Sequence, residues 1–373
     1  MYQYLSNKYG RFIITLIVAI IGGMFFKLLH IPVPWLLGPM IIMVLGKNVL
    51  KWHLTWHDSL RDTGMVIVGY TIGLSMTTAA LREMANQLPS MLLLTLLLML
   101  WCAGIAYVVS RLSNTDFQSA LLGSIPGGLT QVVVLAEETK GINLAVVTVT
   151  QVIRLMIIVI SMPLLVSIPI FNQSTAENMS TSAASVAESA PLFPNIVFFA
   201  VVCIAFAVIG NKINFPTAYL LGPLIATVLL QLAGLNGPHL PAPLINVAQL
   251  MIGTHIGLML ETDQIDHKAR SISLAIGSGL MLMLGSILLA MLLTGMHHVT
   301  KATALLSLAP GGMDQMSIIA HAIGADLSIV SGYQLFRTFS IFFAVPPLLK
   351  WLFKVMGHNK EHKKRHVTPS VKR

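Results

Sequence analysis

Residues 32–41 read PVPWLLGPMI, and residues 216–225 read PTAYLLGPLI, so a ten-residue block returns 184 positions later. Three more motifs recur in the same order, the last at an offset of 183. They are Gly69-x-x-x-Gly73-Leu74 with Gly253-x-x-x-Gly257-Leu258, Pro126-Gly127-Gly128-x-x-Gln131 with Pro310-Gly311-Gly312-x-x-Gln315, and Gln151-x-x-Arg154 with Gln334-x-x-Arg337. Chance does not readily preserve four ordered motifs, so we predict two copies of one structural unit.

The composition places these units in a lipid bilayer. Hydrophobic residues make up 55% of the 373 residues and charged residues only 10%, whereas a soluble domain carries about 25% charged residues. Residues 90–110, 195–210 and 271–296 contain no Lys, Arg, Asp or Glu, and a helix needs about 20 such residues to cross hydrocarbon. The sequence therefore predicts an all-helical polytopic membrane protein and excludes a water-soluble globule.

The repeat divides the chain into four parts. Residues 1–168 are the first membrane repeat, residues 169–194 a polar linker, residues 195–357 the second membrane repeat and residues 358–373 a basic tail. The linker has no Lys or Arg, whereas the amino terminus and the tail are basic. Because cytoplasmic segments are enriched in Lys and Arg, we expect an external linker and cytoplasmic termini. The same rule accounts for most of the net charge of +9, so we expect no direct binding of nucleic acid.

The number of apolar segments constrains how each copy crosses the membrane. Each copy has six, yet a copy that starts inside and ends outside must cross an odd number of times. The fifth segment, residues 117–141 and 300–323, is interrupted by Pro-Gly-Gly, and such breaks at equivalent places mark discontinuous helices in transporters. We predict two repeats of opposite orientation, with about ten transmembrane helices and two broken or re-entrant segments.

Each copy also places one arginine near the middle of its last apolar segment. Arg154 follows Gln151 by three residues, and Arg337 follows Gln334 in the same way, so each pair shares a helical face. A charge at that depth costs at least about 2.5–3.5 kcal/mol. One interpretation is an anion site, because guanidinium binds carboxylate or phosphate in a forked geometry. The other is an internal salt bridge. The candidate acids are Asp314, Asp326, Glu137 and Glu138.

The Pro-Gly-Gly breaks are the second candidate feature. Pro and Gly end one half-helix before the next begins, and glycine lets a ligand approach the backbone. The free N–H groups at the start of the second half-helix suit an anion, although a packing kink is the alternative. The predicted substrate-binding residues are Gly127, Gly128, Thr130, Gln131, Gln151, Arg154, Gly311, Gly312, Asp314, Gln315, Gln334 and Arg337.

The two breaks differ at one position, where Thr130 corresponds to Asp314. Asp314 is the only acid at a break. It could bind a proton as the coupling ion, or it could pair with an arginine. We interpret His255 and His321 as hydrogen-bonded helix residues, because no Cys or His pair has the spacing of metal ligands. The sequence predicts no catalytic residue, metal or cofactor, and the chain is not expected to be an enzyme.

The paired blocks PWLLGPM/AYLLGPL, GYTIGL/GTHIGL and IPGGLTQ/APGGMDQ resemble those of the AbrB family of bacterial inner-membrane proteins, over roughly residues 12–353. That family has a tandem membrane repeat, was once labelled putative ammonia monooxygenase, and takes its name from an association with regulation of gene expression. It also resembles, distantly, cation/proton antiporters and anion transporters with inverted repeats. The resemblance implies a multi-pass inner-membrane protein but brings no established site residues.

Three functions are therefore compared. The first is a secondary transporter of a small, anionic solute driven by a proton or sodium gradient. The second is a membrane regulator that affects gene expression indirectly, because no cytosolic domain able to bind DNA is expected. The third, a membrane oxygenase, would need a metal cluster that the sequence does not contain. The expected partners are a small solute and the lipid bilayer, and a homodimer is left open.

Overall fold

A computed structural model describes residues 8–31, 33–113, 116–126, 142, 144–168, 192–213, 215, 217–259, 268–341, 343 and 347. Helices form all the regular secondary structure in these ranges, and none of the residues described is in a strand. This confirms the all-helical class. Residues 169–191 of the linker and the whole basic tail lie outside the described ranges.

The helices follow the repeat along the chain. The first copy contains α1 (Lys8–Leu28), α2 (Pro34–Asn48), α3 (Asp58–Ser75), α4 (Thr78–Ser113), α5 (Phe117–Ser124) and α7 (Leu144–Val166). The second contains α10 (Leu192–Lys212), α11 (Ala218–Leu232), α12 (Ala242–Met259), α13 (Lys268–Met296), α14 (Lys301–Leu308) and α15 (Met313–Ile323), followed by a helix over residues 327–341. The apolar pattern leaves residues 82–89 between two segments, but α4 runs through them as one 36-residue helix.

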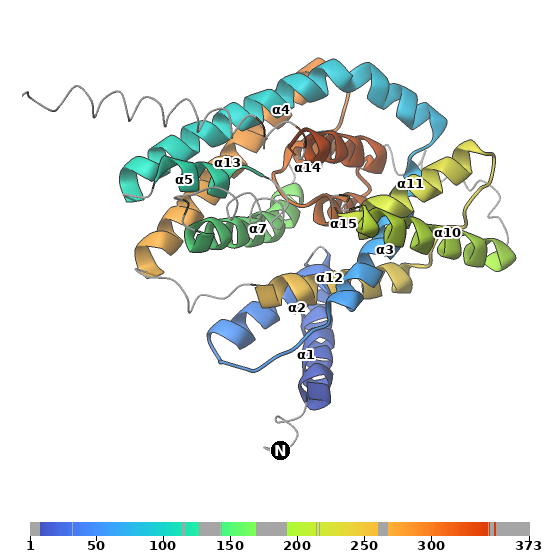
Figure 1. Cartoon of the computed structure of the whole chain (residues 1–373), viewed down its shortest axis with the longest axis horizontal. Helices are drawn as coiled ribbons and strands as arrows, with labels where there is room; N and C mark the ends of the chain where they lie inside the picture. The colour runs from blue at the N-terminus through green and yellow to red at the C-terminus, as the bar shows by residue number, and fades with distance from the viewer. Residues whose placement is uncertain are drawn as a thin grey trace, which may run out of the picture.

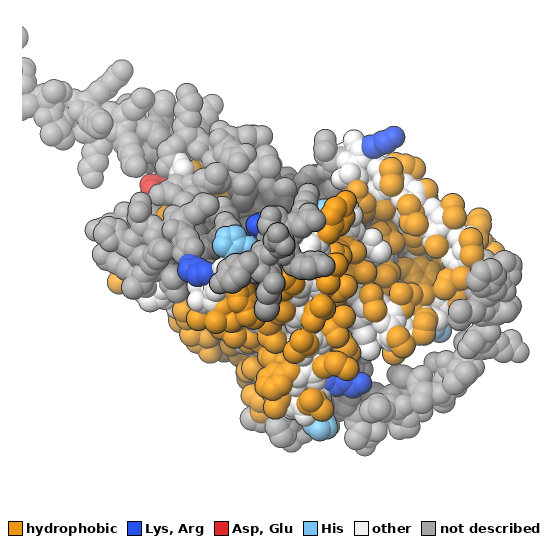
Figure 2. Space-filling model, turned by 90° about the horizontal axis from the view of Figure 1, so that it is seen from below, with side chains coloured by type: hydrophobic (Ala, Val, Ile, Leu, Met, Phe, Trp, Pro, Cys, Tyr) orange, Lys and Arg blue, Asp and Glu red, His pale blue; other side chains and the backbone are white. Residues whose placement is uncertain are grey.

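The outer surface of these helices is apolar. Six of the described helices, α1, α4, α7, α10, α12 and α13, are long and apolar enough to cross a membrane. On α4, Leu92, Leu96 and Leu100 are 53%, 54% and 68% exposed. Figure 2 shows hydrophobic side chains spread over much of one face. Large exposed apolar surfaces mark contact with a membrane or partner, so the chain is a membrane protein in its architecture.

The helices pack in two groups (Figure 1). In the first group, α2 lies between α1 and α12, and α11 lies between α10 and α3. In the second, α4 and α13 pack against each other, α5 packs against α4 and α7, and α14 packs against α13 and α15. Each group therefore combines equivalent helices from both copies. The contacts of α15 with α3 and of α12 with α7 join the two groups.

The recurring glycines allow the first group to form. A Cβ atom added to Gly253 on α12 would overlap the backbone oxygen of Leu36 on α2, and one added to Gly69 on α3 would overlap that of Leu220 on α11. One turn later, a Cβ on Gly257 would overlap the Met40 oxygen. Because backbone cannot rotate away as a side chain can, only glycine permits this approach.

The ends of the same helices are joined by hydrogen bonds between the copies. Lys47 Nζ at the end of α2 donates to Leu258 O on α12 at 2.8 Å. Gln231 Nε2 at the end of α11 donates to Leu74 O on α3 at 3.2 Å. Lys47 and Gln231 are equivalent positions, so each copy caps a carbonyl of the other copy.

Helices α3 and α12, which are equivalent in the repeat, run antiparallel. Near the start of α3, Arg61 lies beside His255, which is close to the end of α12. Further along α3, Gly64 faces Ala248 and Ile252, which come earlier in α12. As α3 advances, its contacts therefore move back along α12.

A Gly253→Ala substitution tests the close approach of α12 to α2. We expect the overlap with the Leu36 oxygen to destabilise the fold by about 1–3 kcal/mol and to lower the melting temperature of the detergent-purified protein. The control is Gly104→Ala on α4, where an added Cβ meets nothing within 4 Å and helix propensity favours alanine. Equal melting temperatures for the two variants would contradict the packing argument.

Candidate functional site

The second copy shows how the Pro-Gly-Gly segment breaks a helix. The Thr300 side chain caps the start of α14 by accepting from the Thr303 N–H. The helix ends at Leu308, residues 309–312 are not helical, and α15 starts at Met313. A Cβ on Gly312 would overlap the side-chain oxygen of Gln315. Glycine at this position therefore leaves room for the polar side chains of the first turn of α15.

Arg337 and Gln334 bind the carbonyl groups that this break leaves free. Arg337 Nη1 donates to Ala309 O at 2.7 Å, and Nη2 donates to Gly311 O at 2.9 Å and to the Gln334 side chain. Gln334 Nε2 donates to Leu306 O at 2.7 Å and to Ala309 O at 3.0 Å. Both side chains are almost fully buried. The guanidinium thus satisfies the end of α14, where the helix dipole is negative.

The first copy repeats this arrangement. Arg154 Nη1 donates to Gly123 O at 3.1 Å and to Ile125 O at 2.9 Å, and Nη2 donates to the Gln151 side chain. Gln151 Nε2 donates to Leu122 O at 2.6 Å and to Ile125 O at 3.0 Å. These carbonyls lie at the end of α5. The other first-copy residues of the predicted site, Gly127, Gly128, Thr130 and Gln131, lie outside the described residues, as do Glu137 and Glu138.

The two arginines lie near each other in the interior. Their positive charges are within electrostatic reach of one another, and both act on the buried thiol of Cys102 on α4. Ile158 of α7 comes within 3.3 Å of where a Gly311 Cβ would lie, so the first copy contacts the second break. Arg154 Nε is a buried donor without a hydrogen-bond partner. The structure therefore brings Gln151, Arg154, Gln334, Arg337 and Gly311 to one central region.

Asp314 stands in the first turn of α15 and is 6% exposed. Its Oδ2 accepts from Gln315 Nε2 at 2.8 Å, while Gln315 Oε1 has no partner. Among the described residues, the charge that acts on Asp314 is Arg61 of α3. The predicted alternative of a pairing with an arginine therefore has Arg61 as its nearest candidate. No ion pair within 4 Å joins the two in the part of the chain described.

Sequence reasoning missed Arg61, because its position before an apolar segment suggested only a topology signal. The structure places it one turn inside α3, which starts at Asp58. One signal could have found it. The repeat equivalent of Arg61 is Ile245, just as that of Asp314 is Thr130, so both charges occur in one copy only.

Arg61 belongs to a small polar cluster with its neighbours. Its Nη2 lies 3.1 Å from Asp62 Oδ1, and its Nη1 lies 3.5 Å from His255 Nε2. His255 Nδ1 is 3.6 Å from Asp58 Oδ1. No group of three or more Cys, His, Asp or Glu residues suited to a metal ion occurs among the described residues.

Comparisons with known proteins match nearly the whole chain. The family described as "Transition state regulatory protein AbrB" matches residues 42–353. "Uncharacterized protein YhjN" of Bacillus subtilis (strain 168) is 25% identical over 364 residues, covering 93% of this chain and 94% of that protein. "Putative regulator AbrB" of Escherichia coli (strain K12) is 24% identical over 345 residues, covering 92% and 96%.

An Arg337→Met substitution tests the capping of α14. Methionine keeps the apolar stem but removes the donor to the Gly311 carbonyl, at about 1–3 kcal/mol for a buried group left unpaired, and leaves the Ala309 carbonyl with Gln334 Nε2 alone. We expect a lower melting temperature of the purified protein and partial recovery in Arg337→Lys, which retains a charged donor. The control is Lys301→Met, at the exposed start of α14. Arg337→Met as stable as this control would remove the capping role.

Proposed function

The chain belongs to the AbrB family, and from this premise we propose that it is a secondary transporter of a small, anionic solute, coupled to an ion gradient across the bacterial inner membrane. The observation that carries the proposal is the pair of buried guanidinium groups, one from each copy, held against the ends of the short helices α5 and α14. Interrupted helices at equivalent places of two repeats are the usual position of a transport site.

The charge balance of this region favours an anion. Each half-helix end offsets about half a positive charge, so two arginines on two helix ends leave about one positive charge in the interior. Water is scarce there, and an uncompensated buried charge is costly. Arg154 Nε and Gln315 Oε1 lack partners. A small hydroxylated or amino carboxylate carries both kinds of group that these atoms require, an acceptor for the first and a donor for the second.

The proposed topology is two repeats of opposite orientation, with residues 169–194 outside and both termini in the cytoplasm. The antiparallel contact of α3 with α12 and the reciprocal caps from Lys47 and Gln231 support it. The half-helices α5 and α14 have 8 residues each, about 12 Å of helix, too short for a hydrocarbon core of about 30 Å. We therefore assign the breaks to these segments and the ten crossings to the others.

Asp314 is the proposed coupling residue. It is a buried carboxyl at the break of the second copy only, so a change in its charge would act on one half of a nearly symmetric site. The chemistry we propose is binding and release, with no enzymatic step, no cofactor and no direct contact with nucleic acid.

A second candidate function is a membrane-embedded regulator. The observation that favours it is the wording of the family description and of the Escherichia coli relative, which both mention regulation. Any influence of this chain on gene expression would then be indirect, through the transported solute. Transcript profiles distinguish the two: a transport-inactive variant resembles the deletion strain if flux is the signal and resembles the wild type if the membrane protein signals by itself.

A flux assay tests the transporter. Thermal-shift screening of the purified protein against small carboxylates selects a ligand, and its radiolabelled form is followed in proteoliposomes. We expect Arg154→Lys, which keeps the charge but loses the fork, to weaken uptake at least about tenfold. The matched control, Gly277→Ala on α13, adds a Cβ that meets nothing within 4 Å. Uptake by Arg154→Lys equal to that by the control would exclude this arginine from the site.

The coupling role of Asp314 needs a separate comparison. We expect Asp314→Asn to abolish accumulation driven by an ion gradient while solute exchange without a gradient continues, because the neutral amide can still accept a hydrogen bond. Accumulation at the wild-type level would contradict the assignment.

Cysteine labelling tests the topology. A membrane-impermeant thiol reagent added to whole cells should label Ser180→Cys in the linker and leave Ser370→Cys in the tail unlabelled. Native Cys102 and Cys203 are buried and should give no background signal. Labelling of both positions, or of neither, from the same side would contradict the opposite orientation of the repeats.

A further inference from the structure

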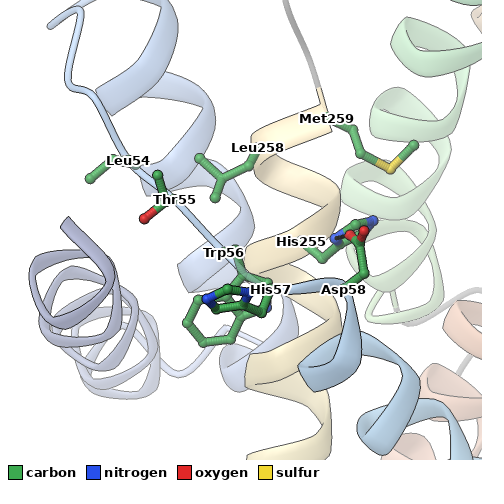
Figure 3. A pocket seen from close by; sticks show the side chains of 8 residues that line it. All are labelled: Leu54, Thr55, Trp56, His57, Asp58, His255, Leu258 and Met259. Carbon is green, nitrogen blue, oxygen red and sulfur yellow. Dashed lines mark ion pairs between the residues drawn. The ribbon is translucent and has the colours of Figure 1, made fainter. Parts of the chain in front are cut away.

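A cleft of about 370 Å³ opens beside the first turn of α3, outside the central site. The segment that joins α2 to α3 forms one wall, and the end of α12 forms the other (Figure 3). Its lining residues are Leu54, Thr55, Trp56, His57, Asp58, His255, Leu258 and Met259. In Figure 3 the side chains of Asp58 and His255 point toward each other from α3 and α12.

Polar side chains lead inward from this cleft. The Asp58 side chain is 83% exposed and the His255 side chain 15%, so the pair spans the boundary between water and interior. The other ring nitrogen of His255 faces Arg61 at 3.5 Å. Arg61 in turn is the charge that acts on Asp314, and α3 packs directly against α15. These contacts link Asp58, His255 and Arg61, whose side chain is 33% exposed, and the packing of α3 on α15 leads from there to the buried Asp314.

Unpartnered polar atoms concentrate along the same path. Among the described residues, eight buried side-chain N or O atoms lack a hydrogen-bond partner, and half of them belong to residues 55–62. These four atoms are Thr55 Oγ1, Trp56 Nε1, Arg61 Nε and Asp62 Oδ1, of which Asp62 Oδ1 has the ion pair with Arg61 Nη2 at 3.1 Å as its contact. Buried polar groups are normally satisfied by protein or by ordered water. A cluster beside an open cleft therefore points to a chain of water molecules.

We propose that this cleft is the entrance through which protons reach Asp314 from the cytoplasmic side, and that His255 is the group that relays them. The inference rests on the proposed coupling role of Asp314 and names the ion as a proton. A hydronium ion that enters the cleft gives its proton to the His255 imidazole and becomes water. The imidazolium then gives a proton to water on its inner side, and that water passes it to the Asp314 carboxylate. The imidazole is neutral again afterwards, so one proton moves and no group is consumed.

The charged groups around the path fit this role. His255 faces Asp58 and Arg61 from α3, and Lys47 of α2 donates to Leu258 O one turn away. Arg61 keeps its own proton, so it does not take part in the transfer. Arg154 and Arg337 are occupied by the carbonyls of α5 and α14. Arg61 is therefore a positioning residue, whereas His255 is the relay.

A pH jump on the full-length protein in nanodiscs tests the relay. A pH-sensitive dye follows proton uptake after rapid acidification. In Asp314→Asn, the dye should no longer report the proton that the Asp314 carboxylate takes up in the wild type. His255→Ala should take up that same Asp314 proton at least about a hundredfold more slowly, the lower end of the contribution of a positioned proton-transfer group. Added imidazole should restore the rate, because the substitution leaves room for it in the cleft.

The matched control is His57→Gln, which alters the exposed histidine of the same cleft and should leave the rate unchanged. Wild-type kinetics in His255→Ala, or slow kinetics that imidazole does not restore, would overturn the relay while the coupling role of Asp314 stands. Uptake by Asp314→Asn identical to wild type would overturn both. If proteoliposomes with the wild-type protein show no solute exchange, the transporter proposal is contradicted but the proton path is not. The two proposals therefore fail separately.

Discussion

The structure depends on how a membrane protein satisfies the carbonyl groups of helices that stop inside the bilayer. Hydrocarbon offers no hydrogen-bond donor. Helix α5 ends at Ser124 and α14 ends at Leu308, and the described residues that follow each of them directly are not helical. The Gln-x-x-Arg pairs solve this by placing donors from the next helix against the last carbonyls of each half-helix. The cost of burying each guanidinium is offset by these bonds and by the negative end of the helix dipole. With both helix ends stabilised, the interior can accommodate a non-helical backbone and the positive charge of the two guanidinium groups.

The two copies share most of their packing contacts, and the few positions at which they differ could make transport directional. The glycine contacts, the caps and the arginine pairs occur in both copies, and a perfectly symmetric site would bind equally well from either side. Asp314 and Arg61 have uncharged equivalents, Thr130 and Ile245. Because α3, which carries Arg61, packs against α15, which carries Asp314, a change in one charge alters one half of the protein more than the other. Ion coupling is therefore expected at Arg61 and Asp314, where the two copies differ in charge.

The helical class and the break of the second copy could be predicted from sequence, because hydropathy reflects the surrounding solvent and Pro-Gly-Gly reflects the backbone. The arrangement of two repeats stays a prediction. The partners of the arginines could not be predicted. Both interpretations of Arg154 and Arg337 looked for a charged partner, whereas their contacts in the structure are carbonyls brought near by the packing of α5 on α7 and of α14 on the helix over residues 327–341. Arg61 was missed for a related reason: its role depends on α15, some 250 residues away in the chain. Hydropathy also left residues 82–89 undecided, since polar residues and Pro89 do not reveal that α4 continues through them.

The reciprocal caps from Lys47 and Gln231 have a consequence for biogenesis. When the first half leaves the ribosome, the carbonyl of Leu74 has no donor until α11 has been synthesised and inserted. The contacts of α2 with α12 and of α3 with α11 are likewise complete only once the second half is present. A gene encoding one half alone would meet the same requirement only by pairing two chains, which is the arrangement from which a fused, duplicated gene would descend.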